Sequence, residues 1–140
     1  MTDKQKQELI ETAVKMTDFS YAPYSHFHVG AALLAKSGEI FTGCNIENAA
    51  YGPSNCAERT AIFKAVSEGV RSFEAIAVVG GAENKDGKVE IKDFCPPCGV
   101  CRQVMSEFCG KEFKIILFDG KDGIKEFTLA ALLPESFSLE

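Results

Sequence analysis

Three cysteines of this 140-residue chain have the spacing of metal ligands. Cys98 and Cys101 are three residues apart, which places both on one face at the start of a helix, and Cys56 begins a separate helical pattern. Structural zinc sites have four protein ligands, whereas catalytic sites have three and leave the fourth position to water or substrate. The spacing therefore predicts an open zinc site suited to hydrolysis.

Two charged residues follow Cys56 closely. Glu58 lies roughly 200° round an ideal helix from Cys56, so it is better placed as a neighbouring acid and base than as a ligand of the same ion. Arg59 is a candidate donor to thiolate sulfur, which would offset the negative charge of three thiolates on one Zn²⁺. Taken alone, each has a plainer interpretation, as a first-turn carboxylate and a solvated cation. Their place beside a cysteine, with a distant C-x2-C pair, favours the functional interpretation.

The other cysteines and the histidines leave alternatives open. Cys95 forms a second C-x2-C pair with Cys98 and is a candidate fourth ligand, which would make the site structural. Pro97 at the expected helix start favours Cys98 with Cys101 instead. Cys44 and Cys109 are expected to be small buried hydrophobes rather than ligands. His26 and His28 are expected to be ordinary surface or turn residues.

Composition and charge are typical of an ordinary globular protein, with 46% hydrophobic and 25% charged residues. A formal net charge of −5 argues against a nucleic-acid partner, and no apolar run approaches the length that spans a membrane. The polar N-terminus lacks the pattern of a secretion signal, so we expect the chain in the cytoplasm. In that reducing compartment, six clustered cysteines indicate metal binding rather than disulfides.

Hydrophobic periodicity predicts one α/β domain that spans residues 1–140. The expected helices cover residues 2–17, 56–68, 98–110 and 129–133. The expected strands cover residues 28–35, 39–44, 73–79, 114–118 and 124–128. Residues 83–93 are polar and are expected to form a surface excursion with Asp86-Gly87 at its tip. The order α-β-β-α-β-α-β-β-α indicates a mixed sheet covered by helices.

Over nearly its whole length the chain resembles the small homotetrameric cytidine deaminases. The segments that carry the resemblance are Tyr24-Ser25-x-Phe27-x-Val29-Gly30-Ala31-Ala32-Leu33, Gly43-Cys44-Asn45-Ile46-Glu47-Asn48-Ala49-Ala50-Tyr51, Cys56-Ala57-Glu58-Arg59, Pro97-Cys98-x-x-Cys101-Arg102-Gln103 and Leu132-Leu133-Pro134-x-x-Phe137. Zinc deaminases have a related H-x-E and P-C-x-x-C signature, in which the glutamate is an acid and base and not a ligand. This chain has Cys56 in the histidine place, as the tetrameric subclass does.

The resemblance implies a fold and a reaction. The fold would be a three-layer α-β-α sandwich around a mixed five-stranded sheet. One Zn²⁺ per subunit would bind Cys56, Cys98 and Cys101, with Glu58 as the proton shuttle. The reaction would be hydrolysis of cytidine and 2′-deoxycytidine to uridine and 2′-deoxyuridine in pyrimidine salvage, with release of ammonia. Glu58 would activate the zinc-bound water that attacks C4 of the base.

The resemblance also implies how the nucleoside is bound. Asn45 and Glu47 would hold the ribose hydroxyls, Phe27 would lie against the pyrimidine, and the backbone of Ala57 would bind the base. An amide and a carboxylate two residues apart on an extended segment point the same way, which suits a sugar, although both could instead cap a loop. By the resemblance, Tyr51 and Phe137 would reach a neighbouring subunit's site. Without the resemblance, the sequence indicates only ordinary buried aromatics at these two positions.

Two departures from the family pattern keep rival functions open. The segment of residues 83–93 is longer than is usual in the family. Before the cysteine pair, Cys95-Pro96 stands where small polar residues are more familiar. One rival is a deaminase of an aminopyrimidine antibiotic such as blasticidin S, or of a nucleotide. Glu47 argues against nucleotides, because its charge would repel a phosphorylated sugar. The other rival is a structural zinc module with Cys95 as the fourth ligand.

Overall fold

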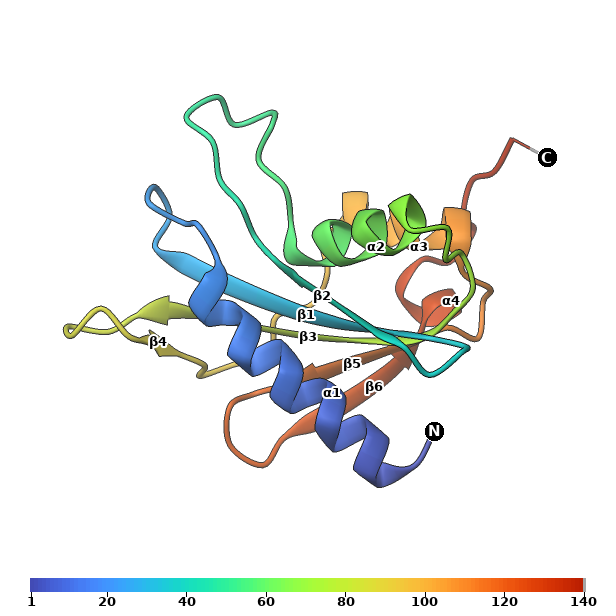
Figure 1. The fold of residues 1–140 in the computed structure, drawn as a ribbon, viewed down its shortest axis with the longest axis horizontal. Helices are drawn as coiled ribbons and strands as arrows, with labels where there is room; N and C mark the ends of the chain where they lie inside the picture. The colour runs from blue at the N-terminus through green and yellow to red at the C-terminus, as the bar shows by residue number, and fades with distance from the viewer. Residues whose placement is uncertain (140) are drawn as a thin grey trace.

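A mixed β-sheet forms the middle layer of the computed structural model, which describes residues 1–139 (Figure 1). Its continuous path runs β2-β1-β3-β5-β6, and β4 pairs only with the end of β3. All neighbours are antiparallel except β3 and β5, which are parallel. The strands are β1 (Phe27–Ala35), β2 (Ile40–Cys44), β3 (Phe73–Glu83), β4 (Val89–Glu90), β5 (Lys114–Phe118) and β6 (Ile124–Thr128).

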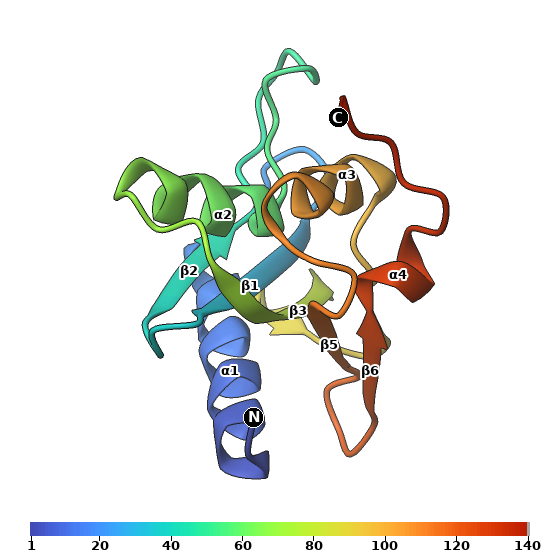
Figure 2. The same ribbon diagram turned by 90° about the vertical axis from the view of Figure 1, so that its right-hand side faces the viewer.

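Helices cover both faces of the sheet. Helix α1 (Asp3–Met16) packs on one face and is followed by a short 3-10 turn, η1 (Thr17–Phe19). The opposite face carries α2 (Ala57–Ser67), α3 (Gly99–Phe108) and the short α4 (Leu129–Leu132), as Figure 2 shows. The three-layer α-β-α arrangement implied by the resemblance is therefore confirmed. Among residues 1–139, no helix has both the length and the apolar character needed to cross a membrane.

The central strands are apolar on both faces because each face has its own core. Along β1, Leu33 points to the layer of α2 and α3, whereas Ala32 and Leu34 point to α1. On β3, Ile76 and Val78 likewise alternate with alanines that face α1. Strands covered on both sides have continuous apolar sequences rather than a polar alternation, and this is why the short apolar runs could be assigned to strands.

The sequence-based elements agree closely with the structure except after residue 79. There β3 continues through two glycines to Glu83, where Ala82 pairs with Glu90 of β4. The predicted excursion is thus partly a strand pair, which adds a sixth strand to the five of the continuous path. Its tip lies where it was expected, with Gly87 at a φ of +76° that favours glycine.

A close approach at Gly43 seats the helix that carries the candidate site. A Cβ added there would overlap the carbonyl of Ala57 and lie 2.6 Å from the backbone nitrogen of Ala61. Helix α2 therefore begins in backbone contact with β2. Since Cys56 is the N-cap of α2, this contact sets the height of the cysteine above the sheet.

Candidate metal centre and active site

The beginnings of two helices bring three cysteine sulfurs together. Cys56 is the N-cap of α2, Cys98 is the N-cap of α3, and Cys101 lies in the first turn of α3. The Sγ atoms of Cys56 and Cys98 are 3.9 Å apart, and those of Cys98 and Cys101 are 3.6 Å apart. All three sulfurs lie within 4.8 Å of one another, and they form the sole such cluster found in residues 1–139. The structure thus groups the three ligands predicted from spacing.

The sulfur separations fit a zinc ion. Tetrahedral coordination with Zn–S bonds of about 2.3 Å places neighbouring sulfurs about 3.8 Å apart, close to both measured distances. The partial positive charge at a helix N-terminus also favours thiolates over thiols, and two helices begin at this cluster. Zn²⁺ is therefore the cofactor that the donor set fits.

Arg59 supplies positive charge to the cluster, as its place in the sequence predicts. Its Nη2 donates to Cys56 Sγ over 3.3 Å, while its Nε is buried with no partner among the described residues. A hydrogen bond from Cys101, together with Arg59, lowers the pKa of Cys56 to about 5. The same hydrogen bond raises the pKa of Cys101 well above its usual range. One sulfur thus ionises readily while its neighbour keeps the proton, and a divalent cation would remove this competition.

Glu58 is the buried carboxylate of the site. It lies in the first turn of α2, and only 4% of its surface is exposed. Burial raises its pKa to about 7; the negative charge of Cys56 adds to this rise, and a backbone hydrogen bond opposes it. A group that is half protonated near neutral pH can both accept and deliver a proton. Glu58 lies outside the cluster of three sulfurs, as the helix geometry predicts.

Cys95 does not join the three sulfurs, so the cluster contains three cysteines rather than four. Its side chain packs where Gly80 lacks a Cβ, next to the ring of Phe27. Burial raises its pKa to about 11, with smaller effects from the charges of Glu58 and Cys56. Cys95 is thus a protonated wall residue, and its place outside the cluster argues against a fourth ligand.

A pocket of about 400 Å³ opens beside the sulfurs. It is lined by residues of β1, the β2–α2 loop, the start of α2 and the segment before α3. The lining residues are Val29, Asn45, Glu47, Tyr51, Ser54, Asn55, Cys56, Glu58, Arg59, Cys95, Pro96 and Cys98. Residues predicted to bind metal, to move protons and to hold a sugar therefore share one cavity.

Asn45 and Glu47 are tied to the strand entry opposite their loop. Asn45 Oδ1 accepts from the N–H of Val29 over 2.8 Å, and its Nδ2 donates to the carbonyl of Phe27 over 2.9 Å. Glu47 accepts from two backbone N–H groups and from the hydroxyl of Ser25, and this hydroxyl is the main cause of its lowered pKa. Both side chains are therefore preorganised, and Glu47 is ionised at neutral pH.

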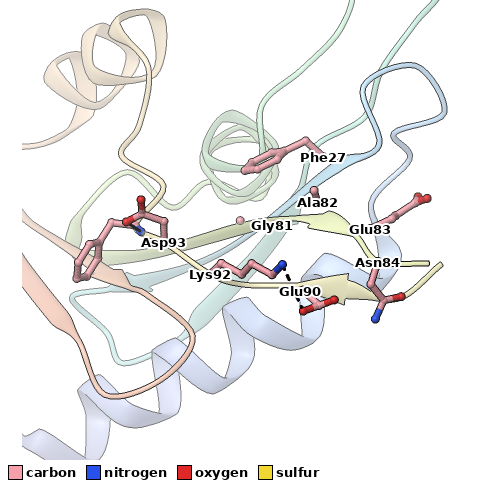
Figure 3. Close-up of a pocket in the computed structure, with 10 residues that line it drawn as sticks. Phe27, Gly81, Ala82, Glu83, Asn84, Glu90, Lys92 and Asp93 are labelled. Atoms are coloured by element: carbon pink, nitrogen blue, oxygen red, sulfur yellow. Dashed lines mark hydrogen bonds and ion pairs between the residues drawn. The ribbon is translucent and has the colours of Figure 1, made fainter. Parts of the chain in front are cut away.

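Phe27 lies on the border of a second pocket, of about 320 Å³ (Figure 3). Its ring stands over the end of β3, where Phe27 pairs with Ala82. Because the side chain of Cys95 lies next to this ring and lines the first pocket, Phe27 adjoins that pocket without being among its lining residues. Ala57 is fully buried as the first residue of α2, where a backbone N–H has no partner within the helix.

The two aromatics with a predicted cross-subunit role are strongly exposed. Tyr51 is 83% exposed at the tip of the β2–α2 loop, and Phe137 is 68% exposed in the C-terminal tail. The alternative interpretation, ordinary buried aromatics, is therefore wrong. A hydrogen bond of 3.2 Å from Gln103 Nε2 to the carbonyl of Phe137 ties the tail to α3.

Two polar residues near the site escaped the sequence-based interpretation. Ser25 binds Glu47 across 22 positions of sequence, and Arg102 donates to the carbonyls of Pro97 and Leu132 over 2.8 Å each. Arg102 thus anchors the segment that precedes Cys98. Both stand inside the motifs that carry the family resemblance, which was the signal available for finding them.

The histidines and the two other cysteines take no part in the metal centre. Cys44 is buried as expected, and Cys109 is half-buried. His26 is an exposed turn residue, also as expected. His28 differs, because its side chain is only 12% exposed and its Nε2 lies 2.6 Å from a carboxylate oxygen of Glu83.

The α-β-α fold and the open three-sulfur centre with a buried carboxylate define a zinc-dependent hydrolytic enzyme. Residues 3–117 match the cytidine and deoxycytidylate deaminase zinc-binding region. A cytidine deaminase of Sporosarcina psychrophila is 53% identical over 96% of this chain and 92% of its own. The crystal structure of a cytidine deaminase from Burkholderia pseudomallei aligns with a TM-score of 0.83 at 43% identity, covering 98% of this chain and all of that one. The chain belongs to the cytidine and deoxycytidylate deaminase family.

The family also contains relatives with another substrate. A blasticidin-S deaminase from Bacillus cereus is 33% identical over 96% of this chain and 94% of its own length. The sequence identity to the cytidine deaminase of Sporosarcina psychrophila is higher by 20 percentage points, over the same share of this chain.

Proposed function

We propose that this enzyme hydrolyses cytidine and 2′-deoxycytidine to uridine and 2′-deoxyuridine, with release of ammonia. The observation that carries the proposal is Glu58, a buried carboxylate with a pKa near 7 in a pocket beside three sulfurs spaced for zinc. A structural site has no need of a buried acid in that position. Hydrolysis of an exocyclic amine does, because protons must be removed from water and delivered to the leaving group.

Cys56, Cys98 and Cys101 would hold Zn²⁺, which would supply a Lewis acid that makes water a nucleophile at neutral pH. Glu58 accepts a proton from the attacking water as the water oxygen bonds to C4 of the base. The carboxyl then delivers this proton to ring nitrogen N3, accepts the proton of the new hydroxyl on C4, and delivers that second proton to the exocyclic nitrogen. The bond between C4 and that nitrogen breaks, and ammonia leaves.

The nucleoside is held by residues on three elements. Asn45 and Glu47 bind the ribose hydroxyls, and three of roughly four lone-pair positions on Glu47 already have donors, which leaves about one for a sugar hydroxyl. Phe27 packs against the flat face of the pyrimidine. The backbone of Ala57 binds the base at the start of α2, next to the metal ligand Cys56.

The assembly that we propose is a homotetramer with one Zn²⁺ per subunit. Tyr51 and Phe137 then contribute to a neighbouring subunit's site, and their exposure in the single chain supports this role, because large aromatics in water are typical of protein interfaces. We place the enzyme in the cytoplasm, where it serves pyrimidine salvage.

A panel of substrates tests the activity. Ammonia release is measured from cytidine, 2′-deoxycytidine, cytidine monophosphate, adenosine and blasticidin S. We expect turnover of the two cytosine nucleosides, and weak turnover of the nucleotide because Glu47 repels its phosphate. Turnover of blasticidin S alone would instead identify an antibiotic deaminase.

A further inference from the structure

The hydroxyl of Ser25 connects the two side chains that we assign to the sugar and to the base. It donates to Glu47 Oε2 over 2.5 Å and accepts the backbone N–H of Phe27 over 3.1 Å. A serine hydroxyl has one proton, and here that proton is directed to the carboxylate. The chain of hydrogen bonds therefore runs in one direction, from Phe27 through Ser25 to Glu47.

Glu47 depends on this short segment for every hydrogen bond that the structure gives its carboxylate. Its Oε1 accepts the N–H groups of Tyr24 and Ser25, each over 3.1 Å, and its Oε2 accepts the Ser25 hydroxyl. The hydroxyl is the donor that Oε2 would lose in an alanine variant. Oε2 is thus the oxygen whose direction Ser25 controls.

The backbone between Ser25 and Phe27 is strained. His26 has a φ of +58°, a left-handed conformation that is uncommon for residues other than glycine. It persists because the N–H of His26 binds the carbonyl of Ala22 and the next N–H binds the Ser25 hydroxyl. The hydroxyl therefore helps to set the direction in which the chain enters β1 and presents Phe27.

Asn45 holds the other side of the same residue. Its Nδ2 donates to the carbonyl of Phe27, while its Oδ1 accepts the N–H of Val29. Both backbone polar groups of Phe27 are thus bound by side chains, the N–H through Ser25 to Glu47 and the carbonyl directly to Asn45. The sugar-binding pair and the base-binding ring form one connected unit.

We propose that Ser25 is a positioning residue that aligns Glu47 with the sugar and couples this alignment to the placement of Phe27. The inference rests on the proposed function, because it concerns how the nucleoside is held. It implies that the preference of the enzyme for nucleosides with sugar hydroxyls depends on a serine that need not touch the substrate.

Steady-state kinetics with two substrates test this role. The values of kcat and KM are measured for cytidine and for 2′,3′-dideoxycytidine, which lacks the 2′ and 3′ hydroxyls. In Ser25→Ala we expect KM for cytidine to rise about 30-fold, as for a lost hydrogen bond to a charged group, with kcat changed less than about threefold. KM for the dideoxy substrate should rise less than about fivefold. The effect of Ser25 that acts through Glu47 needs a 2′ or 3′ hydroxyl of the sugar as partner, and this substrate lacks both.

Three further variants separate positioning from a general structural effect. Ser25→Thr retains a hydroxyl and should restore KM for cytidine to within about threefold of the wild type. In a Glu47→Gln background, Ser25→Ala should raise KM less than about fivefold, because the carboxylate that the serine aligns is gone. Ser67→Ala removes a comparable exposed hydroxyl at the end of α2 and should leave both KM values unchanged.

The outcomes distinguish this inference from the proposed function. A wild-type enzyme that deaminates cytidine but whose Ser25→Ala variant loses both substrates equally would overturn the positioning role alone. The same conclusion would follow from an undiminished loss in the Glu47→Gln background. A wild-type chain that does not deaminate cytidine would overturn the proposed function and this inference with it.

Discussion

Replacement of Glu58 by glutamine should abolish turnover and stabilise the fold at the same time. The wild-type carboxyl is buried, and its pKa rises from 4.5 to about 7 on folding. Between these values the unfolded chain is ionised while the folded chain still binds a proton, so stability falls as the pH rises through this range. The loss reaches about 3 kcal/mol above pH 7 and is absent below pH 4.5.

The variant Glu58→Gln stays neutral at every pH and therefore avoids this loss. At pH 8 we expect it to be more stable than the wild type by about 3 kcal/mol, and at pH 5 by about 1 kcal/mol. For a domain of this size the thermal midpoint should rise by about 10 °C at pH 8 and by about 3 °C at pH 5. Turnover should fall at least about 100-fold, because the group that moves the protons is missing.

The metal does not remove the basis of this prediction. Three thiolates on Zn²⁺ have a formal net charge of −1, the same as the charge of an ionised Cys56. The formal charge that Glu58 faces is therefore similar in both cases.

Thermal unfolding of the zinc-loaded proteins, at matched protein and zinc concentrations, measures the effect. Glu68→Gln makes the same chemical change at the exposed C-cap of α2, and should show no such dependence on pH. A gain in midpoint for Glu58→Gln that is equal at pH 5 and pH 8, or retention of wild-type turnover, would refute the reasoning.

Four other substitutions test the ligands and their supports. Cys98→Ser should lose zinc, whereas Cys95→Ser should keep it. A metal analysis with the reverse result would identify Cys95 and Cys98 as the ligand pair. Gly43→Ala should destabilise the fold by about 1–3 kcal/mol in urea unfolding, because its Cβ would overlap the carbonyl of Ala57; an unchanged midpoint would contradict that contact. Arg102→Ala removes two charged hydrogen bonds to backbone carbonyls, and should weaken zinc retention in a chelator competition at least about tenfold; unchanged retention would count against its anchoring role.

Most of the fold could be predicted because local signals coincide with the tertiary arrangement. The capping box of Thr2 with Gln5 begins α1, and Gly69 ends α2 with a φ of +88°. The extension of β3 could not be predicted, because Gly80 and Gly81 weaken a strand pattern and the pairing with β4 depends on distant residues.

The candidate site likewise has features that could be predicted from the sequence and features that could not. Spacing found the three cysteines, but two overlapping C-x2-C pairs have equal spacing, so the preference for Cys98 with Cys101 depended on Pro97 at the expected helix start. The structure decides because α3 begins at Gly99, which makes Cys98 its N-cap and leaves Cys95 in the extended segment before it. The hydrogen bond between Ser25 and Glu47 joins two loops with no shared periodicity, so no pattern could indicate it.

The dependence of cytidine deamination on added zinc tests the central claim most directly. Ammonia release from cytidine is measured for a chain stripped by a chelator and then titrated with zinc. We predict that the stripped chain is inactive, and that activity rises linearly and saturates at one zinc per chain. Full activity in the stripped chain, or one tightly bound zinc per chain without ammonia release, would contradict the account.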